Sequence, residues 1–428
     1  MNRAATAAMR SNVSRSAHPA FIVILAGVCA ALHIGKLPPA VIALQHSLGL
    51  GLVEAGFLLS LVQLAGMSAG VAFGALADGL GLKRSMVLGL LILSLASALG
   101  GGAQSVGWLL ALRAVEGLGF LLVVLPAPGL VRRLVAPERL DAMLGVWGAY
   151  MPCGAAIALL LGPLLIGTVG WRAWWWALGA ATLAMAFWLA RAVPGETATK
   201  PDGVNAAATA AATATAPAAA SLTPAWVARL RQTLARRGPW LVAMSFAAYS
   251  SQWLAVIGFL PTIYLQAGIA GVATGALTAL AAGVNMVGNL AAGRLLHRGA
   301  RPTVLLAIGF IAMGVASIAA FAGPSGAWLP AWLRYIAVLL FSMLGGVIPA
   351  TLFSLAVRVA PSERTVSSTV GWVQQWSAFG QFAGPPLVAW VASRAGGWQW
   401  TWTVTATLSL LGLWLSARIG ATLQVADK

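Results

Sequence analysis

The sequence predicts an all-α membrane protein in which twelve transmembrane helices form two parallel six-helix repeats. Composition is the first reason, because 60% of the 428 residues are hydrophobic and only 8% are charged, with a mean hydropathy of +0.88. Soluble domains carry roughly 25% charged residues. The second reason is a series of apolar stretches long enough to cross a bilayer. The third is a duplication that relates the two halves of the chain.

The apolar stretches are helices rather than strands. A helix needs about 20 apolar residues to cross a bilayer core of about 30 Å. The strands of a membrane barrel are shorter and alternate between apolar and polar residues, which is not the pattern here. The twelve predicted spans lie at 20–44, 53–76, 85–103, 107–130, 142–168 and 174–193, and then at 239–266, 272–296, 303–322, 329–356, 367–393 and 399–419.

The first stretch follows three arginines, which is a feature that it shares with secretory signal peptides. Its length of about 25 residues, the lysine at position 36 and the lack of an A-x-A-like cleavage site favour a retained span instead. Residues 1–19 are therefore expected to form a tail before the first helix.

The basic residues predict the orientation in the membrane. With the N-terminus in the cytoplasm, 21 of the 26 Lys and Arg residues fall in cytoplasmic segments, and Arg172 and Arg394 lie in outer loops. Cytoplasmic loops of membrane proteins carry such an excess. We therefore expect a multi-pass protein of the plasma (bacterial inner) membrane with both termini in the cytoplasm. The net charge of +17 then reports topology and contact with lipid headgroups, not binding to nucleic acid.

One long break separates the two sets of six spans. Residues 194–238 begin with low-complexity Ala/Thr sequence, typical of a flexible connector. They end in a basic segment with apolar residues on one helical face, which predicts an amphipathic helix at the cytoplasmic surface. The predicted organisation is a tail at 1–19, a bundle at 20–193, this linker, a second bundle at 239–419 and a tail at 420–428.

The two bundles repeat each other in sequence. APERLDAMLGVW at 136–147 corresponds to APSERTVSSTVGW at 360–372, and each segment leads to a Gly-Pro pair, at 162–163 and 384–385. The offset stays between 221 and 227 residues over some sixty positions, which indicates a real duplication. Parallel repeats of this kind are typical of transporters whose solute site lies between the halves, near the middle of the membrane.

Two motifs resemble those of the major facilitator superfamily. The loop at 74–84 reads GALADGLGLKR and is similar to the pattern G-x-L-A-D-x-x-G-x-[KR]-[KR], while Arg113-x-x-Glu116-Gly117-x-Gly119 is similar to R-x-x-[QE]-G-x-G. The stretch HIGKLPP at 33–39 resembles the cyanate/nitroimidazole-type permease branch of that superfamily. The resemblance implies the major facilitator fold, with gating and motif residues Gly74, Asp78, Gly81, Lys83, Arg84 and Gly117.

In this resemblance Asp78 pairs with Lys83 and Arg84 as a cytoplasmic latch that breaks when the halves rock. Exposed ion pairs contribute only about 0 to 1 kcal/mol, so such a latch is easily broken. The alternative is that Lys83 and Arg84 serve orientation alone.

Three cations lie inside predicted spans, namely Lys36, Arg113 and Arg334. Inserting one costs about 2.5 to 3.5 kcal/mol, so each is expected to face a wet cavity or a partner. Glu116 lies one turn from Arg113, and His33 shares a helical face with Lys36. The remaining positive charge favours an anion as the solute. Alternatively, Lys36 snorkels to the outer surface and the arginines bind backbone carbonyls.

Polar residues in other spans are further candidates. We expect solute contacts from Lys36, Arg113, Arg334, His33, Tyr249, Gln252, Asn285 and Gln374, although hydrogen bonds between helices explain the last four equally well. Glu116 and His33, and also Asp78, are candidates to carry a proton. Trp174, Trp175 and Trp176 are interpreted as an aromatic belt at the membrane surface.

The predicted function is secondary active transport of a small, anionic solute by alternating access, in the form of proton-coupled import. A proton-coupled exporter of drugs or metabolites is the alternative, although the antiporter glycine pattern of span 5 is only partial. An intramembrane enzyme is a remote third possibility, because the chain has four histidines, two isolated cysteines and no HExxH. No Walker sequence occurs. We expect no cofactor or metal, no nucleic acid and a monomer whose partners are its solute, protons and lipids.

Overall fold

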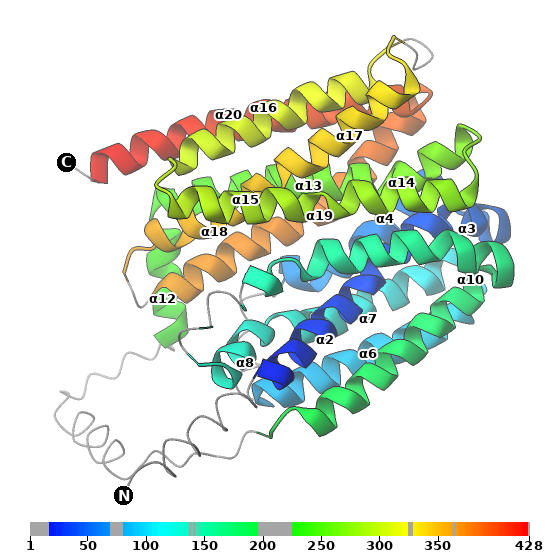
Figure 1. Ribbon diagram of the computed structural model, residues 1–428, viewed down its shortest axis with the longest axis horizontal. Coiled ribbons are helices and arrows are strands. Elements are labelled where there is room, and N and C mark those ends of the chain that lie inside the picture. The colour runs from blue at the N-terminus through cyan, green and yellow to red at the C-terminus, as the bar shows by residue number, and fades with distance from the viewer. Residues whose placement is uncertain are drawn as a thin grey trace, which may run out of the picture.

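The computed structural model describes residues 17–68, 80–136, 139, 143, 145–195, 225–323, 328–362 and 365–426 (Figure 1). Within these ranges every regular element is an α-helix or a short 3-10 helix. The predicted all-α membrane fold is confirmed.

The first half contains α2 (Ala17–Gly35), η1 (Pro38–Ala40), α3 (Val41–Leu48), α4 (Leu52–Ser60), η2 (Leu61–Gln63), α6 (Leu82–Gly101), α7 (Val106–Val124), α8 (Ala127–Leu134) and α10 (Tyr150–Ala192). The second half contains α13 (Arg237–Gln266), α14 (Gly271–Gly283), α15 (Asn285–His297), α16 (Pro302–Phe321), α17 (Ala331–Gly345), α18 (Val347–Arg358), α19 (Val366–Ala395), η5 (Trp398–Trp400) and α20 (Thr401–Ala426). Between them lies α12 (Ala225–Leu234), in the basic segment expected to be helical.

The helices correspond to the predicted spans. Nine stretches of the described residues are long and apolar enough to cross a membrane. One of them contains the 43-residue α10, which holds two predicted spans because the chain turns back at Gly170, where φ is 84° (Figure 1). Only glycine adopts such a φ without strain. The two other predicted spans correspond to α19 and to the shorter apolar helix Leu52–Ser68.

The two halves share their helix breaks. The fourth span is divided between α7 and α8 just before Pro126, and the tenth is divided between α17 and α18 just before Pro349. The second span is interrupted at Ser60 and the eighth at Val284. Breaks at corresponding places support the duplication found in the sequence. The exact domain boundaries, including the linker from 194 to 238, stay predictions.

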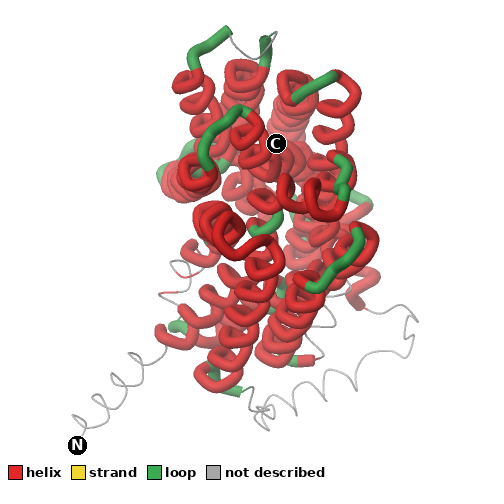
Figure 2. The backbone as a smooth tube through the Cα atoms, turned by 90° about the vertical axis from the view of Figure 1, so that its right-hand side faces the viewer, coloured by secondary structure: helices red, strands yellow, loops and turns green. Residues whose placement is uncertain are grey.

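The halves contact each other mainly through α4 with α19 and through α10 with α14. A Cβ atom on Gly56 would lie 2.8 Å from the Cα atom of Pro386, so α4 and α19 approach to backbone contact there. Figure 2 looks at the end of the molecule where these contacts lie and shows helices side by side, joined by short loops. The start of α2, the end of α20 and α12 lie at the opposite end (Figure 1).

Candidate functional site

A cluster of charged side chains forms where the first span bends. Helix α2 ends at Gly35 and the chain continues into η1 at Pro38. Pro38 and Pro39 lack a backbone N–H, so the hydrogen-bond pattern of α2 cannot continue through them. Lys36 therefore lies at the bend, where its carbonyl oxygen accepts a hydrogen bond from Trp174 Nε1 at 3.0 Å. Its side chain is completely buried.

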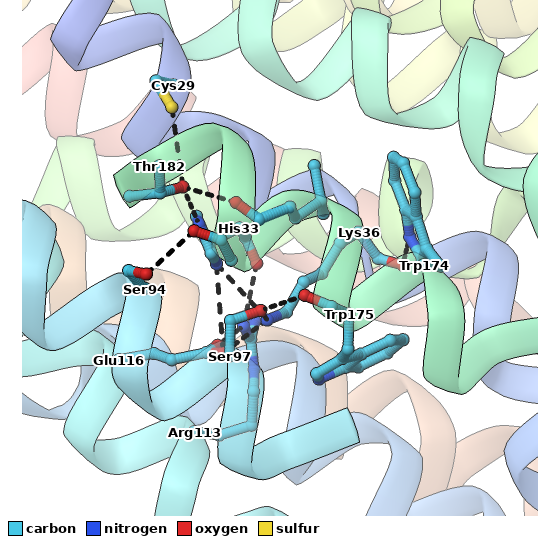
Figure 3. A network of polar contacts seen from close by, with 12 residues as sticks. Cys29, His33, Lys36, Ser94, Ser97, Arg113, Glu116, Trp174, Trp175 and Thr182 are labelled. Carbon is cyan, nitrogen blue, oxygen red and sulfur yellow. Dashed lines mark hydrogen bonds and ion pairs between the residues drawn. The ribbon is translucent and has the colours of Figure 1, made fainter. Parts of the chain in front are cut away.

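The ammonium group of Lys36 has four neighbours (Figure 3). It forms an ion pair with Glu116 Oε1 and donates to Ser97 Oγ at 3.0 Å. Nζ also lies 3.3 Å from His33 Nδ1 and 4.9 Å from the centre of the Trp175 ring. An ammonium has three N–H donors, and the three polar neighbours supply three acceptors. The geometry therefore fits the protonated form of Lys36.

Arg113 binds the other oxygen of the same carboxylate. Its Nη1 pairs with Glu116 Oε2 and donates to the His33 carbonyl at 2.8 Å, and its Nε donates to the Leu58 carbonyl at 3.0 Å. The guanidinium therefore joins α7 to α2 and α4. Its Nη2 is buried and has no hydrogen-bond partner among the described residues.

His33 occupies one tautomer. Its Nε2 lies 2.7 Å from Thr182 Oγ1, and the Thr182 hydroxyl donates its hydrogen to the Leu178 carbonyl at 2.8 Å. Thr182 can therefore only accept from His33, so Nε2 carries the hydrogen. His33 Nδ1 is then the atom that accepts from Lys36. The imidazole in this arrangement is neutral.

The charge cluster, which we define as His33, Lys36, Arg113 and Glu116, has a net charge of +1. Two cations share one carboxylate, and all four side chains are at most 1% exposed. Buried charges are costly even when paired, and removing one partner is strongly destabilising. Such a cluster inside an apolar bundle marks a functional site.

The glycines of the motif after Arg113 allow close packing around this cluster. A Cβ atom on Gly117 would lie 2.5 Å from the Val62 carbonyl oxygen, and one on Gly119 would lie 2.7 Å from the Gly89 carbonyl oxygen. Any larger residue would push α7 away from η2 or from α6. The motif therefore combines the charged pair with the backbone contacts that hold it.

The third predicted cation lies elsewhere. Arg334 is in α17 of the second half, is partly buried, and donates from Nε to the Ala320 carbonyl at 2.8 Å. The structure thus brings together Lys36 and Arg113, whose excess charge is partly neutralised by Glu116, and leaves Arg334 on a different pair of helices.

The uncharged candidates form separate contacts in the second half. Asn285 Nδ2 donates to Tyr249 Oη at 3.0 Å and to the Ser342 carbonyl at 2.8 Å. Gln252 is buried, and its Oε1 accepts from Ser409 Oγ at 2.9 Å, which links α13 to α20. Gln374 Oε1 is buried with no partner among the described residues. Of these four residues, Gln374 alone has a buried side-chain oxygen with no hydrogen-bond partner among the described residues.

The predicted cytoplasmic latch is only partly within the described residues. Gly74 and Asp78 lie outside them, so the latch stays a prediction. Gly81 has a φ of 89° directly before α6, which explains why the motif has a glycine there. Lys83 Nζ donates to the Ala190 carbonyl at 2.7 Å, near the C-terminal end of α10, where a cation is favourable. Arg84 is exposed.

The sequence did not indicate the neutral side chains around the charge cluster. Ser97 and Thr182 lie on α6 and α10, and nothing in their spacing marks them as partners of residues in α2. The interpretation of Trp174 and Trp175 as a surface belt is wrong, because they are 2% and 0% exposed and pack against Lys36. Trp176, which is 51% exposed, fits that interpretation.

Comparison with known proteins gives a family match over most of the chain. The family model described as Major Facilitator Superfamily matches residues 23–377. A crystal structure of a bacterial homolog of the human lysosomal transporter Spinster, in an inward-facing and occupied conformation, superimposes with a TM-score of 0.75. It covers 94% of this chain and 96% of its own, at 15% sequence identity, so this similarity concerns the fold alone.

Curated relatives are similar over shorter regions. The Methylenomycin A resistance protein of Bacillus subtilis (strain 168) is 31% identical over 30% of this chain and 28% of its own length. The Puromycin resistance protein pur8 of Streptomyces alboniger is 37% identical over 23% of this chain and 20% of its own. The human Solute carrier family 2, facilitated glucose transporter member 10, is 29% identical over 43% of this chain and 34% of its own length. The chain thus matches about a third or less of the length of each.

Proposed function

Because this chain belongs to the Major Facilitator Superfamily and is a multi-pass membrane transporter, we propose that it couples the movement of a small organic solute to a proton. The two six-helix halves would expose the solute site to one side of the membrane and then to the other. The observation that carries the proposal is the charge cluster, in which Lys36 and Arg113 share Glu116. Gain or loss of one proton changes the charge of this buried site, and hence the conformation that it favours.

The contacts between the halves support alternating access. At Gly56, which approaches Pro386, and at Gly275, which approaches the Leu159 and Leu160 carbonyls, a glycine lets the two halves come into backbone contact. Their separation breaks no helix, so each half can move as a unit. The charge cluster lies within the first half and moves with it.

We propose that transport is directed outward. Support comes from the names of relatives, which include two antibiotic resistance proteins and the Tetracenomycin C resistance and export protein of Streptomyces glaucescens. An exporter driven by protons would exchange the solute for incoming protons.

Uptake of a small anion is the second candidate. It is favoured by the net charge of +1 in the charge cluster and by Arg113 Nη2, which is buried without a partner among the described residues. A guanidinium with a free N–H edge matches a carboxylate-like group. Arg334, Tyr249, Asn285 and Gln374 remain candidates for further solute contacts in the second half.

We place the end that carries α12 in the cytoplasm of a bacterium, and the protein in the plasma membrane. Four arginines around α12 and the start of α13 are exposed, at 229, 231, 236 and 237. Positive residues are retained on the cytoplasmic side and contact anionic headgroups there. Labelling of single cysteines from either side of the membrane tests this placement.

Proton movement in proteoliposomes tests the proposed function. Purified protein is reconstituted with a pH-sensitive dye inside, a proton gradient is imposed, and lipophilic cations, neutral drugs and small organic anions are added in turn. At least one class should change the rate at which the gradient decays. Glu116→Gln should abolish this change, whereas Glu54→Gln should not, because Glu54 is an exposed carboxylate at the start of α4. Solute movement with no proton movement in the unmodified protein would contradict the proposal.

A further inference from the structure

The excess of one positive charge in the charge cluster determines which group can exchange a proton. A proton added to Glu116 would leave Lys36 and Arg113 buried with no counter-ion and raise the net charge to +2. A proton added to His33 would also give +2, and it would have to occupy Nδ1, the atom that accepts from Lys36. Arg113 does not lose its proton in proteins. Of these four groups, only Lys36 can bring the net charge of the cluster to zero, by losing a proton.

We infer that Lys36 is the proton carrier of this transporter and alternates between an ammonium and a neutral amine. This inference rests on the proposed coupling to protons. In the neutral form Arg113 and Glu116 remain as a balanced ion pair. The proton leaves Nζ as H⁺ to water when the site opens, and the lone pair stays on nitrogen. The described state, with Nζ fully buried among three acceptors, is the protonated one.

In the part of the chain that the structure describes, no other charged group near Lys36 could take this role. From α2 it meets His33, and from α7 it meets Glu116, whose other oxygen pairs with Arg113. From α6 and α10 the neighbouring side chains are Ser97 and the tryptophans, which carry no charge (Figure 3). Among the described residues, the charge on Nζ is therefore balanced by Glu116 alone.

A change of protonation at Lys36 reaches two helices of the first half through Ser97. In the ammonium form Ser97 accepts from Nζ and donates to the Trp175 carbonyl at 2.8 Å, which joins α6 to α10. The neutral amine has a lone pair that needs a donor, and the Ser97 hydroxyl is 3.0 Å away. Rotation of that hydroxyl toward Nζ releases the Trp175 carbonyl. Proton loss thus loosens a contact between α6 and α10 next to the bend of the first span.

The same charge difference links the solute to the direction of transport. With the ammonium the cluster carries +1, and with the amine it carries none. A cationic solute nearby favours the amine and exchanges with a proton, whereas an anionic solute favours the ammonium and travels with one. This coupling is reciprocal. Export against protons therefore predicts a cationic solute, and proton-coupled uptake predicts an anion.

Nuclear magnetic resonance of lysine side chains tests the inference without a known solute. The chain has four lysines, at positions 36, 83, 200 and 428, so ¹³Cε-labelled protein in nanodiscs gives few signals. The signal of Lys36 is the one missing from both Lys36→Met and Lys36→Arg, so the assignment survives if one variant does not fold. We expect this signal to change from the shift of an ammonium to that of an amine between about pH 6 and 9.

A Lys36 signal that keeps one shift over this range would overturn the inference, whatever the transport assays show. The proposed function fails separately, if the unmodified protein moves solute without protons. A matched control is Glu116→Gln combined with Lys36→Met, which keeps the net charge at +1 on Arg113 with no titrating amine. Solute-dependent proton movement in that double variant would also contradict the role of Lys36.

Discussion

Replacement of Glu116 by glutamine removes the one carboxylate that balances two buried cations. Glutamine has nearly the same shape, so the packing around Lys36 and Arg113 is retained while the net charge rises from +1 to +2. Removing one partner of a buried ion pair costs about 3 to 5 kcal/mol. We expect the free energy of unfolding to fall by about that amount, measured in detergent by titration with a denaturing surfactant.

A second substitution that restores the net charge should recover part of the lost stability. The additional change Lys36→Met returns the net charge to +1, so the double variant should be more stable than Glu116→Gln alone. Lys36→Met by itself leaves the neutral Arg113–Glu116 pair and should lower stability by only about 2 kcal/mol. It loses hydrogen bonds to Ser97 and His33 worth about 1 kcal/mol each, while the lost ion pair with Glu116 is offset by the removal of a buried charge. If Glu116→Gln were as stable as the surface control Glu54→Gln, the shared ion pair would not have the importance assigned to it.

Three further predictions concern the surroundings of the cluster and the contact between the halves. Gly117→Val should destabilise the fold by about 1 to 3 kcal/mol, because its side chain would collide with the Val62 carbonyl; equal thermal stability of variant and parent would contradict this. Arg113→Lys should also destabilise the fold by about 1 to 3 kcal/mol, because an ammonium lacks the planar set of donors that binds the two carbonyls and the carboxylate at once. The unfolding titration used for Glu116→Gln measures this change, and unchanged stability would contradict it. Gly56→Leu should leave each half folded but prevent α4 from closing against α19 at Pro386. A cysteine introduced near this contact should then stay accessible to a soluble maleimide. If it reacts as slowly as the same cysteine in the parent protein, the prediction is refuted.

The fold was largely predictable from the sequence, because the features that define it are local. A span is a run of about 20 apolar residues, and each predicted span corresponds to a described helix or to part of one. The duplication was visible because Gly-Pro pairs and motif residues kept their offset. The ion pair of Arg113 with Glu116 was also predictable, since residues three apart lie on the same face of a helix.

The contacts of Lys36 were not predictable in the same way. Its partners Glu116 and Ser97 lie 80 and 61 residues away in the chain, and only the packing of α2, α6 and α7 brings them together. A proline pair follows Lys36 in the sequence, but the direction in which the bend turns the lysine depends on the neighbouring helices. For the same reason Trp174 and Trp175 resembled surface residues, although they close the cluster on the side of α10.

Arg334 shows that a cation inside a predicted span need not belong to the charge cluster. It lies in the first turn of α17, at a place that corresponds in the duplication to Arg113 in α7. Its turn lacks a counterpart of Glu116, since Ala337 occupies the position three residues later. The arginine contacts the Ala320 carbonyl in α16 instead, so the two halves have diverged in charge while keeping their helices.

The most direct test of the account is the movement of protons through Lys36. Proteoliposomes that contain the unmodified protein should release or take up protons when a transported solute is added, and those with Lys36→Met should bind the same solute without moving protons. Equal proton movement in the two preparations would contradict the claim that the charge cluster is the site of coupling.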